Sequence, residues 1–232
     1  MGILYIVATP IGNLQDITLR AIKVLQEVDV IACEDTRKTG ILLSQVLPVD
    51  CQKPRLVSYY EENELQRIPE VIAALKDELN IALVSDAGTP TVSDPGFKLV
   101  RECIEQGIKV VSLPGPSSVI TALTVSGLPT DKFLFVGYPP KKPGHRQTFF
   151  ENLTKLSLKT TVILFDGPHH ILRTLEEMKG IFGDMEIVIC RELTKTYEEI
   201  RRETISKSIE HFTKKLPKGE FIILFNEFPS KQ

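Results

Sequence analysis

Short apolar runs alternate with amphipathic stretches through the first half of the chain. Between the runs, apolar residues recur at spacings of three and four, which is typical of one face of a helix. One such face comprises Ile17, Ala21, Leu25 and Val28, and another comprises Leu65, Ile68, Ile72, Leu75 and Leu79. The apolar runs have the length of buried strands and lie at Leu4–Ala8, Val30–Ala32, Arg55–Ser58, Ile81–Ser85 and Lys109–Leu113. This alternation predicts an α/β fold with a mostly parallel sheet.

The second half follows a different pattern. Proline and glycine punctuate both ends of Leu113–Lys132, which predicts a hinge between two lobes, residues 1–116 and 117–232. Beyond it, strands are predicted at Phe133–Gly137, Thr160–Phe165, Glu186–Cys190 and Glu220–Asn226, and a helix is marked by Ile171, Leu175, Met178 and Phe182. The stretch from Val188 to Thr204 leaves room for a hairpin before the last strand. We therefore expect two α/β lobes, the second with a mixed sheet, and a ligand cleft between them.

Composition narrows the class of protein. Of the 232 residues, 42% are hydrophobic and 25% are charged, which is ordinary for a globular protein, and the net charge is −2. No apolar run approaches the roughly 18 residues of a membrane span, and the N-terminus lacks the basic start of a signal peptide. The four cysteines form no CxxC pair, and the adjacent His169 and His170 do not share a helix face. We expect a cytoplasmic protein with reduced thiols and without a metal or a membrane partner.

Three loops that follow predicted strands carry both glycine and proline. They span Ala8–Asn13, Ser85–Gly96 and Leu113–Ser118. In a parallel sheet all three emerge at the carboxyl edge, where ligands bind. Any one of them alone is ordinary turn chemistry, but three at one edge favour a ligand site. Neither GxGxxG nor GxxxxGK[ST] occurs, so NAD or ATP bound in the usual way is not expected.

Two of these loops also open predicted helices. Ser93 or Asp94 is predicted to cap a helix that starts at Pro95, and Ser117 is predicted to cap the helix Ser118–Val125. The first turn of a helix has free N–H groups and a partial positive charge. Both helix starts therefore suit a carboxylate or a phosphate.

Five blocks of sequence occur in an order that resembles a known family. They are VATPIGNLQDITLRA (Val7–Ala21), ACEDTRKTGILL (Ala32–Leu43), ALVSDAGTPTVSDPG (Ala82–Gly96), VVSLPGPSSVITAL (Val110–Leu123) and RELTKTYEEI (Arg191–Ile200). Together they resemble the tetrapyrrole-methylase superfamily over about residues 1–226. EDTR and SDAGTP are most similar to its ribosomal RNA small subunit methyltransferase I branch.

The resemblance implies an S-adenosylmethionine-dependent enzyme, usually a homodimer, with the cofactor folded in the cleft between the lobes. Its implied substrate is the ribose 2′-hydroxyl of one cytidine in the decoding region of 16S rRNA, in the small ribosomal subunit. The implied partner is thus RNA and not DNA.

The family's cofactor residues map onto the three loops and onto the second lobe. In the loops they fall on Pro10, Gly12, Asp86, Ala87, Gly88, Thr89, Asp94, Pro95, Gly96, Gly115, Pro116, Ser117 and Ser118. In the second lobe they fall on Leu164, Phe165, Arg191, Glu192 and Leu193. S-adenosylmethionine carries no phosphate, so it needs backbone groups and one or two carboxylates, such as those of Asp86 and Asp94. Backbone N–H groups at Ser117 and Ser118 suit its carboxylate.

Methyl transfer to a hydroxyl is an in-line displacement, in which alignment and desolvation supply most of the catalysis. The hydroxyl must lose its proton, so a general base or an orienting acceptor is expected. The candidates are Glu34, Asp35 and Glu192, while Arg37 and Lys195 are candidates to hold phosphate or to stabilise the forming alkoxide. For each residue a solvated salt bridge is an equal alternative, and the sequence does not choose among them.

RNA binding requires positive charge. Lys141, Lys142, His145 and Arg146 cluster in a proline-rich loop, and Arg20, Arg37 and Lys38 are candidates to extend this patch. A solvated loop leading into a helix is the alternative interpretation of the cluster.

Two other functions remain open. One is a methyltransferase of the same fold acting on a small, tetrapyrrole-like molecule, which an apolar trough would favour over a basic rim. The other is a ribosome-associated protein that binds S-adenosylmethionine without catalysis. Its support is the segment Phe165–His170, which reads FDGPHH where family members often carry Y-E-S-x-H-R.

Overall fold

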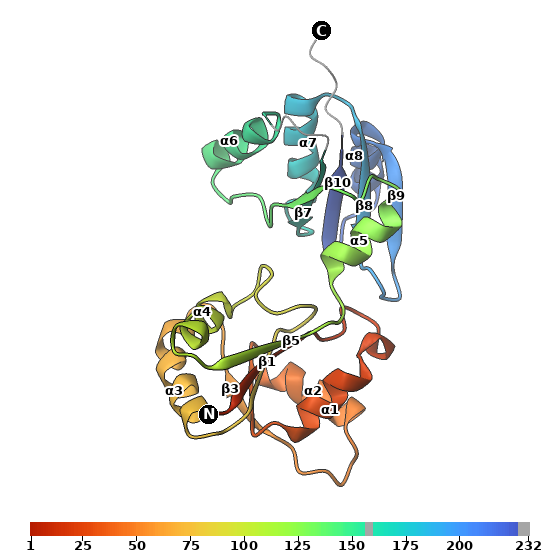
Figure 1. The fold of residues 1–232 in the computed structure, drawn as a ribbon. Coiled ribbons are helices and arrows are strands. Elements are labelled where there is room, and N and C mark those ends of the chain that lie inside the picture. Colours follow the sequence, from red (N-terminus) through yellow and green to blue (C-terminus); the bar gives the residue numbers. More distant parts are fainter. Residues whose placement is uncertain (156–159, 227–232) are drawn as a thin grey trace. The chain divides into compact units, whose positions relative to one another are not determined.

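The computed structural model describes residues 1–155 and 160–226, and the chain divides into two units at Ser117. Met1–Ser117 form the first unit, and the second begins at Ser118 (Figure 1). Each unit contains a five-stranded sheet with helices packed against it. The fold is therefore α/β, as the hydrophobic pattern predicts.

The first unit is built on an all-parallel sheet with strand order β3-β2-β4-β1-β5. Its strands are β1 (Ile3–Val7), β2 (Val30–Cys33), β3 (Arg55–Ser58), β4 (Ile81–Val84) and β5 (Lys109–Leu113). Every strand predicted for this half is present, with ends that agree to within one residue. Strand β1 lies between β4 and β5, and its Leu4 is opposite Ile81 on one side and Val110 on the other.

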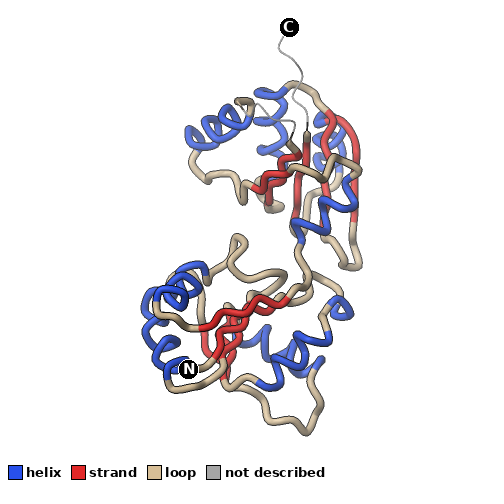
Figure 2. The backbone as a smooth tube through the Cα atoms, in the orientation of Figure 1, coloured by secondary structure: helices blue, strands red, loops and turns tan. Residues whose placement is uncertain are grey.

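Helices cover both faces of this sheet. They are the 3-10 turn η1 (Leu14–Asp16), α1 (Leu19–Glu27), α2 (Thr36–Val46), α3 (Glu64–Lys76) and α4 (Phe97–Glu105). Apolar residues of α1 and α2 pack in one core cluster, and those of α3 and α4 pack in another on the opposite face (Figure 2). The crossovers that move along the sheet in one direction thus place their helices on one face, and those that return use the other face.

Three local predictions in this unit were wrong. Helix α4 begins at Phe97 with Gly96 as its N-cap, so neither Ser93 nor Asp94 caps a helix that starts at Pro95. Leu65 does not belong to the apolar face of α3, because it is 68% exposed. That helix also ends at Lys76, before Leu79. Helix α2 was not predicted, since its sequence, TRKTGILLSQV, has only a short apolar stretch.

The second unit contains a mixed sheet with strand order β6-β7-β10-β8-β9. The strands are β6 (Phe133–Phe135), β7 (Thr161–Asp166), β8 (Glu186–Arg191), β9 (Glu199–Thr204) and β10 (Phe221–Phe225). Among the described residues of this unit, β6 and β7 pair in parallel, and the pairs β7–β10, β10–β8 and β8–β9 are antiparallel. The predicted mixed sheet is confirmed, and so is a hairpin between Val188 and Thr204, formed by β8 and β9.

The helices of the second unit are α5 (Ser118–Ser126), α6 (Pro143–Leu153), α7 (Ile171–Phe182) and α8 (Ile205–Lys214). Helix α5 begins at Ser118, as predicted. The four apolar residues that marked α7 are all buried in the core, which confirms that face. All five residues of β10 are buried, as expected for a central strand covered on both faces.

Two absences apply to the described parts of the chain. In residues 1–155 and 160–226, no helix is both long and apolar enough to cross a membrane. The same residues contain no group of three or more His, Cys, Asp or Glu side chains placed to hold a metal ion. All four cysteines have free thiols.

Candidate functional site

The carboxyl edge of the first sheet contains a topological switch point. Strands β1 and β4 are neighbours, but the chain leaves β1 for α1 on one face of the sheet and leaves β4 for α4 on the other. The carboxyl edge at such a switch point is where open α/β sheets bind ligands. The loops that follow these two strands, Ala8–Asn13 and Ser85–Gly96, are among the three that were predicted from the sequence to bind a ligand.

Thr9 joins the first loop to the second. Its N–H donates to the Gly88 carbonyl over 2.9 Å, and the Gly88 N–H donates to the Thr9 carbonyl over 3.0 Å. The Thr9 hydroxyl also donates to the carbonyl of Ser85 (3.2 Å), and both side chains are buried. Sequence reasoning missed Thr9 and Ser85 as site residues, although each stands directly at the end of a predicted strand.

The third loop closes on the other two. The Thr89 hydroxyl donates to the Pro116 carbonyl over 2.9 Å. A Cβ on Gly115 would lie 2.9 Å from the Cβ of Ala8, which is too close for a side chain. The third loop can therefore approach the first loop this closely only with glycine at position 115. Gly88, at φ +84°, adopts a conformation that favours glycine. The structure thus brings together the three loops that the sequence predicted would meet.

The EDTR segment after β2 joins the same edge through Asp86. The Asp86 carboxylate accepts a hydrogen bond from the Asp35 N–H (3.2 Å) and forms an ion pair with Lys38 Nζ (2.6 Å). Lys38 therefore neutralises a carboxylate of the site. The sequence had suggested instead that Lys38 extends a basic patch.

Glu34 and Asp35 have opposite electrostatic surroundings. Burial raises the pKa of Glu34, and the nearby negative charge of Asp86 raises it further. Hydrogen bonds from the Arg37 guanidinium and from the Arg37 backbone N–H hold the pKa of Asp35 far below its usual range. Arg37 Nε and Nη2 lie 3.0 and 2.7 Å from the two Asp35 oxygens, and Asp35 also caps α2 by accepting from the Arg37 N–H.

The second loop contains strained backbone, and Glu64 anchors its end. Thr91 and Ser93 have φ values of +75° and +61°, which is unusual for any L-residue and more so for a β-branched one. The buried Glu64 carboxylate accepts from the Gly96 N–H (3.0 Å) and the Tyr59 hydroxyl (3.1 Å). It also pairs with Lys98 Nζ at 3.0 Å. Sequence reasoning missed Glu64, because it lies just outside the predicted apolar face.

The remaining predicted cofactor residues of the first unit differ in exposure. Gly12, Ala87 and Gly115 are exposed, whereas Gly88 and Gly96 are buried. The half-buried ones are Pro10, Asp86, Thr89, Asp94, Pro95, Pro116 and Ser117, together with Ser118 at the start of the second unit. None of the three loops contains Lys, Arg or His, so their polar groups are backbone amides, hydroxyls, the side-chain amide of Asn13 and two carboxylates.

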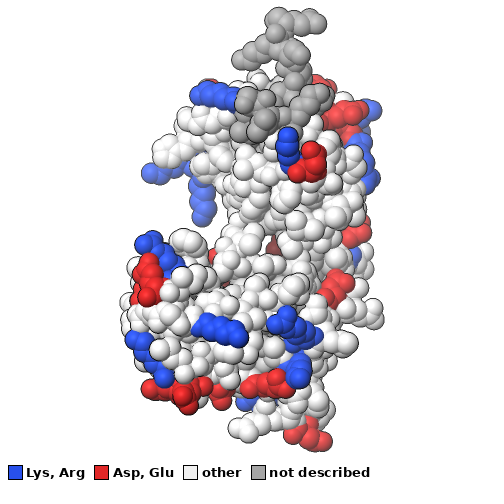
Figure 3. All heavy atoms as spheres, viewed as in Figure 1, with Lys and Arg blue, Asp and Glu red and all other residues white. Residues whose placement is uncertain are grey.

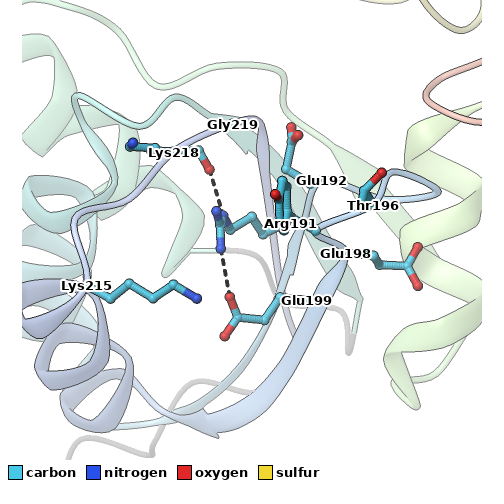
Figure 4. Close-up of a pocket in the computed structure, with 9 residues that line it drawn as sticks. Arg191, Glu192, Thr196, Glu198, Glu199, Lys215, Lys218 and Gly219 are labelled. Carbon is cyan, nitrogen blue, oxygen red and sulfur yellow. Dashed lines mark hydrogen bonds and ion pairs between the residues drawn. The ribbon is translucent and has the colours of Figure 1, made fainter.

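In the second unit, Arg191 and Glu192 border a pocket of about 600 Å³ at the end of β8 (Figure 4). Arg191 is held by the Lys218 carbonyl (2.6 Å to Nε) and by Glu199 (3.1 Å to Nη1). Glu192 has a positive φ of +51°, and its carboxylate accepts from the Glu220 N–H (3.0 Å). Leu193 is buried beside them.

Lys195 is engaged by carboxylates on both sides. Its Nζ lies 2.9 Å from Glu192 Oε1 and 2.7 Å from Glu220 Oε2. Burial alone would raise the pKa of Glu192, but the hydrogen bonds from Lys195 and the Glu220 N–H, together with the charges of Lys195 and Arg191, outweigh it, and the net shift is downward. Glu192 is therefore a weaker base than Glu34 in this structure, and Lys195 has little free charge to offer a phosphate.

The other second-unit candidates lie on β7. The side chain of Leu164 is fully buried in the core, so it faces no ligand. Phe165 is half-buried and lies edge-on to Phe135 at 4.7 Å and to Tyr138 at 5.4 Å between ring centroids. Phe165 thus presents a partly exposed aromatic edge, whereas only the backbone of Leu164 is available there.

One predicted RNA contact was wrong. Arg146 is not part of an exposed basic cluster, because only 4% of it is exposed. Its guanidinium pairs with Glu177 (2.7 Å) and donates to the Thr174 hydroxyl (2.6 Å). Lys141, Lys142 and His145 remain exposed.

Comparison with known proteins defines the class first. The family model described as Tetrapyrrole (Corrin/Porphyrin) Methylases matches residues 3–208. The solved uroporphyrin-III-C-methyltransferase from Thermus thermophilus is 19% identical, with a TM-score of 0.67 over 97% of this chain and 94% of that one. A cobalt precorrin-4 methyltransferase is 18% identical, with a TM-score of 0.69 over 96% of this chain and 94% of its own. The fold is therefore that of the tetrapyrrole methyltransferases.

More similar relatives define the family. The ribosomal RNA small subunit methyltransferase I of Thermotoga maritima is 44% identical over 226 residues, which cover 97% of this chain and 99% of that protein. The protein of the same name from Haemophilus influenzae is 46% identical over 98% of this chain and 80% of its own. The chain belongs to the ribosomal RNA small subunit methyltransferase I family.

Proposed function

We propose that this protein transfers the methyl group of S-adenosylmethionine to ribosomal RNA of the small subunit, at the ribose 2′-hydroxyl of a cytidine in the decoding region of 16S rRNA. The observation that carries the proposal is the identity of 44–46% with ribosomal RNA small subunit methyltransferase I proteins over nearly the whole chain. The loops at the switch point of the first sheet supply the matching chemistry.

The donor set of these loops fits S-adenosylmethionine. Carboxylates and carbonyls can bind the cationic sulfonium and ammonium groups of this cofactor, and together with backbone amides they can bind its ribose hydroxyls. The loops contain no cationic side chain for a phosphate. Asp94 and Asp86, which also pairs with Lys38, are the two carboxylates, and Gly88 and Gly115 permit close approach of the backbone. One solved tetrapyrrole methyltransferase from Thermus thermophilus, 16% identical with a TM-score of 0.64, is complexed with S-adenyl homocysteine.

When bound, the sulfonium supplies an electrophilic methyl group. The protein must then align the ribose hydroxyl and accept its proton. Glu34 is the best candidate for this base, because burial and Asp86 raise its pKa, and a carboxylate with a raised pKa is a stronger base. Asp35 is less suited, since Arg37 engages both of its oxygens.

The assembly and the cellular location are part of the same proposal. We expect a homodimer in the cytoplasm, acting on the assembled small subunit. Light scattering coupled to size-exclusion chromatography measures the mass of the assembly, and a monomer at micromolar concentration would overturn the dimer.

Transfer of tritium from labelled S-adenosylmethionine tests the activity. The substrates are small ribosomal subunits that lack the modification, with naked 16S rRNA in parallel. We expect label on the subunits within an alkali-resistant dinucleotide, because a 2′-methyl group blocks alkaline cleavage at that linkage. Label on subunits but not on naked RNA would mean that assembled structure is recognised.

Two results would overturn the proposal. Binding of S-adenosylmethionine without any label on RNA, but with label on a tetrapyrrole, would indicate a small-molecule enzyme. Binding without transfer to either substrate would indicate a ribosome-associated protein without catalysis.

A further inference from the structure

The segment between β6 and α6 presents exposed side chains outside the site described above. Tyr138 is 57% exposed, and Lys141 and Lys142 are exposed as well. Within the described residues neither lysine has an ion-pair partner. In Figure 3, Lys and Arg atoms protrude over this segment with no Asp or Glu atoms beside them. The surface is thus locally cationic on a protein whose net charge is −2.

A buried arginine holds this segment from beneath. Arg146 Nη1 donates to the Pro140 carbonyl over 3.2 Å, directly next to the two lysines. Its other nitrogens are fixed by Glu177 and Thr174 of α7, at 2.7 and 2.6 Å. The guanidinium thus ties the segment to α7 and lies against the ring of Phe150, whose centroid is 5.9 Å away.

The start of the segment is fixed by β7. The Val136 N–H donates to the Ile163 carbonyl, and the Phe165 N–H donates to the Gly137 carbonyl, each over 3.0 Å. The Phe165 ring then supports the Tyr138 ring edge-on. One aromatic ring and two cations are therefore presented by backbone that is anchored at both ends.

We propose that Tyr138, Lys141 and Lys142 form a preorganised surface that binds RNA, and that Arg146 positions it. The inference rests on the proposed RNA methyltransferase function and names a contact surface for that substrate. Lysines contact phosphates, and an exposed tyrosine ring stacks on an unpaired base. Anchoring the segment before binding reduces the ordering entropy that RNA binding must overcome.

The test compares three variants with the unmodified protein on small ribosomal subunits. The double variant Lys141→Ala/Lys142→Ala is expected to raise KM at least tenfold and to leave kcat and S-adenosylmethionine affinity unchanged. The loss of two phosphate contacts in this variant is also expected to reduce the magnitude of the slope of log affinity against log salt by about 1.4, the value for single-stranded RNA. Tyr138→Ala is expected to weaken RNA binding about tenfold, whereas Tyr138→Phe retains the ring and is expected to bind normally.

The matched control is Lys76→Ala/Lys109→Ala. It removes the same charge from exposed positions at the end of α3 and the start of β5 in the first unit. We expect it to leave the KM and the salt slope unchanged. An equal effect of both double variants would overturn the proposal, because it would indicate a general charge effect.

Arg146→Lys tests the positioning role. It keeps the charge but loses the fork that reaches Pro140, Thr174 and Glu177 together. We expect a higher KM at unchanged kcat, with the cofactor affinity of the unmodified protein. A normal KM in a folded variant would overturn the positioning role. If the variant does not fold, the lysine and tyrosine variants still decide whether the surface binds RNA.

The results separate the inference from the proposed function. If the unmodified protein labels no RNA, the proposed function is wrong. If it labels RNA and the lysine and tyrosine variants do so with normal KM, only the binding surface is wrong. Binding of inorganic phosphate or an acidic peptide that is as tight as RNA binding would also overturn the assignment to RNA.

Discussion

Glu34 and Asp35 are neighbours in the chain, but their surroundings assign them different roles. Burial and the charge of Asp86 oppose ionisation of Glu34, whereas Arg37 stabilises the charged form of Asp35. A proton acceptor needs a free oxygen and appreciable basicity. Glu34 meets this requirement better, and Asp35 caps α2 and orients Arg37.

This difference predicts the effect of two isosteric variants. Glu34→Gln is expected to lower kcat by about 10²–10⁴, the usual contribution of a general base, with unchanged cofactor affinity. Asp35→Asn is expected to have a smaller effect, because asparagine is also a good N-cap. Single-turnover methyl transfer measures both rates. A larger loss of kcat for Asp35→Asn than for Glu34→Gln would instead assign the role of the base to Asp35.

The pH dependence provides a second measurement of Glu34. Its carboxyl has a raised pKa and must be deprotonated to accept a proton, so kcat/KM is expected to rise with pH. The midpoint of this limb should lie above the ordinary glutamate value of about 4.3. The limb should be absent from the residual activity of Glu34→Gln.

Gly115 lies where the first and third loops pass closest. Gly115→Ala would place a methyl group 2.9 Å from the Ala8 Cβ and push the two loops apart. We expect about a tenfold loss of S-adenosylmethionine affinity, measured by calorimetry. The control is Gly180→Ala, which meets nothing within 4 Å in α7 and should stabilise the protein by about 0.5–1 kcal/mol. Normal affinity in Gly115→Ala would argue against a tight cofactor loop there.

At the scale of elements, the β8–β9 hairpin is stabilised by charged residues. Glu199 lies 3.1 Å from both Arg191 and Arg201, and Glu203 lies 2.7 Å from Arg201. Burial alone would raise the pKa of both carboxyls, but their hydrogen bonds and the neighbouring positive charges together outweigh it and leave both pKa values lowered. The ionised carboxylates therefore stabilise the folded state.

A lowered pKa makes this stabilisation dependent on pH. It is fully present above the ordinary carboxyl value of about 4.3 and is lost as the pH falls towards the lower folded-state values. We expect the free energy of unfolding in urea to fall between about pH 5 and pH 3. Glu199→Gln/Glu203→Gln should reduce this slope. An unchanged slope would mean that other carboxylates dominate acid unfolding.

Hydrophobic periodicity predicted helices and strands well where one face of the element is apolar. It failed where the element is short or where charged residues interrupt the apolar pattern. The strands of the first sheet and the four core residues of α7 follow clear patterns and are confirmed. Strand β9, EIRRET, lacks the alternation of a half-buried strand because its charged side chains pair with one another. Helix α4 starts two residues after Pro95 because Gly96, at φ +125°, is not helical and forms the N-cap.

At the scale of the whole molecule, the two units have separate cores. Among the described residues, one core cluster lies entirely within the second unit, and two lie within the first. Helix α5 packs against β10, so it belongs to the second unit. We therefore propose that the boundary at Ser117 separates two units that can fold independently.

Expression of residues 118–232 alone tests this proposal. We expect a cooperative urea transition and the circular dichroism of a mixed α/β sheet, because strands β6 to β10 and helices α5 to α8 are all retained. A matched fragment that begins at Phe133 lacks α5 and should be less stable. Absence of a cooperative transition in the longer fragment would mean that the first unit is required for folding.

The sequence by itself determined the α/β class, the first sheet's strands and the three loops, because buried strands and strand-end glycines leave local patterns. Tertiary structure decided which side chains meet. Lys38 reaches Asp86 across 48 positions, and Arg146 reaches Glu177 across 31. Such pairs depend on strand order and helix packing, which no local pattern encodes. The roles of Glu34, Asp35 and Arg146 therefore became distinct only when the fold placed their partners beside them.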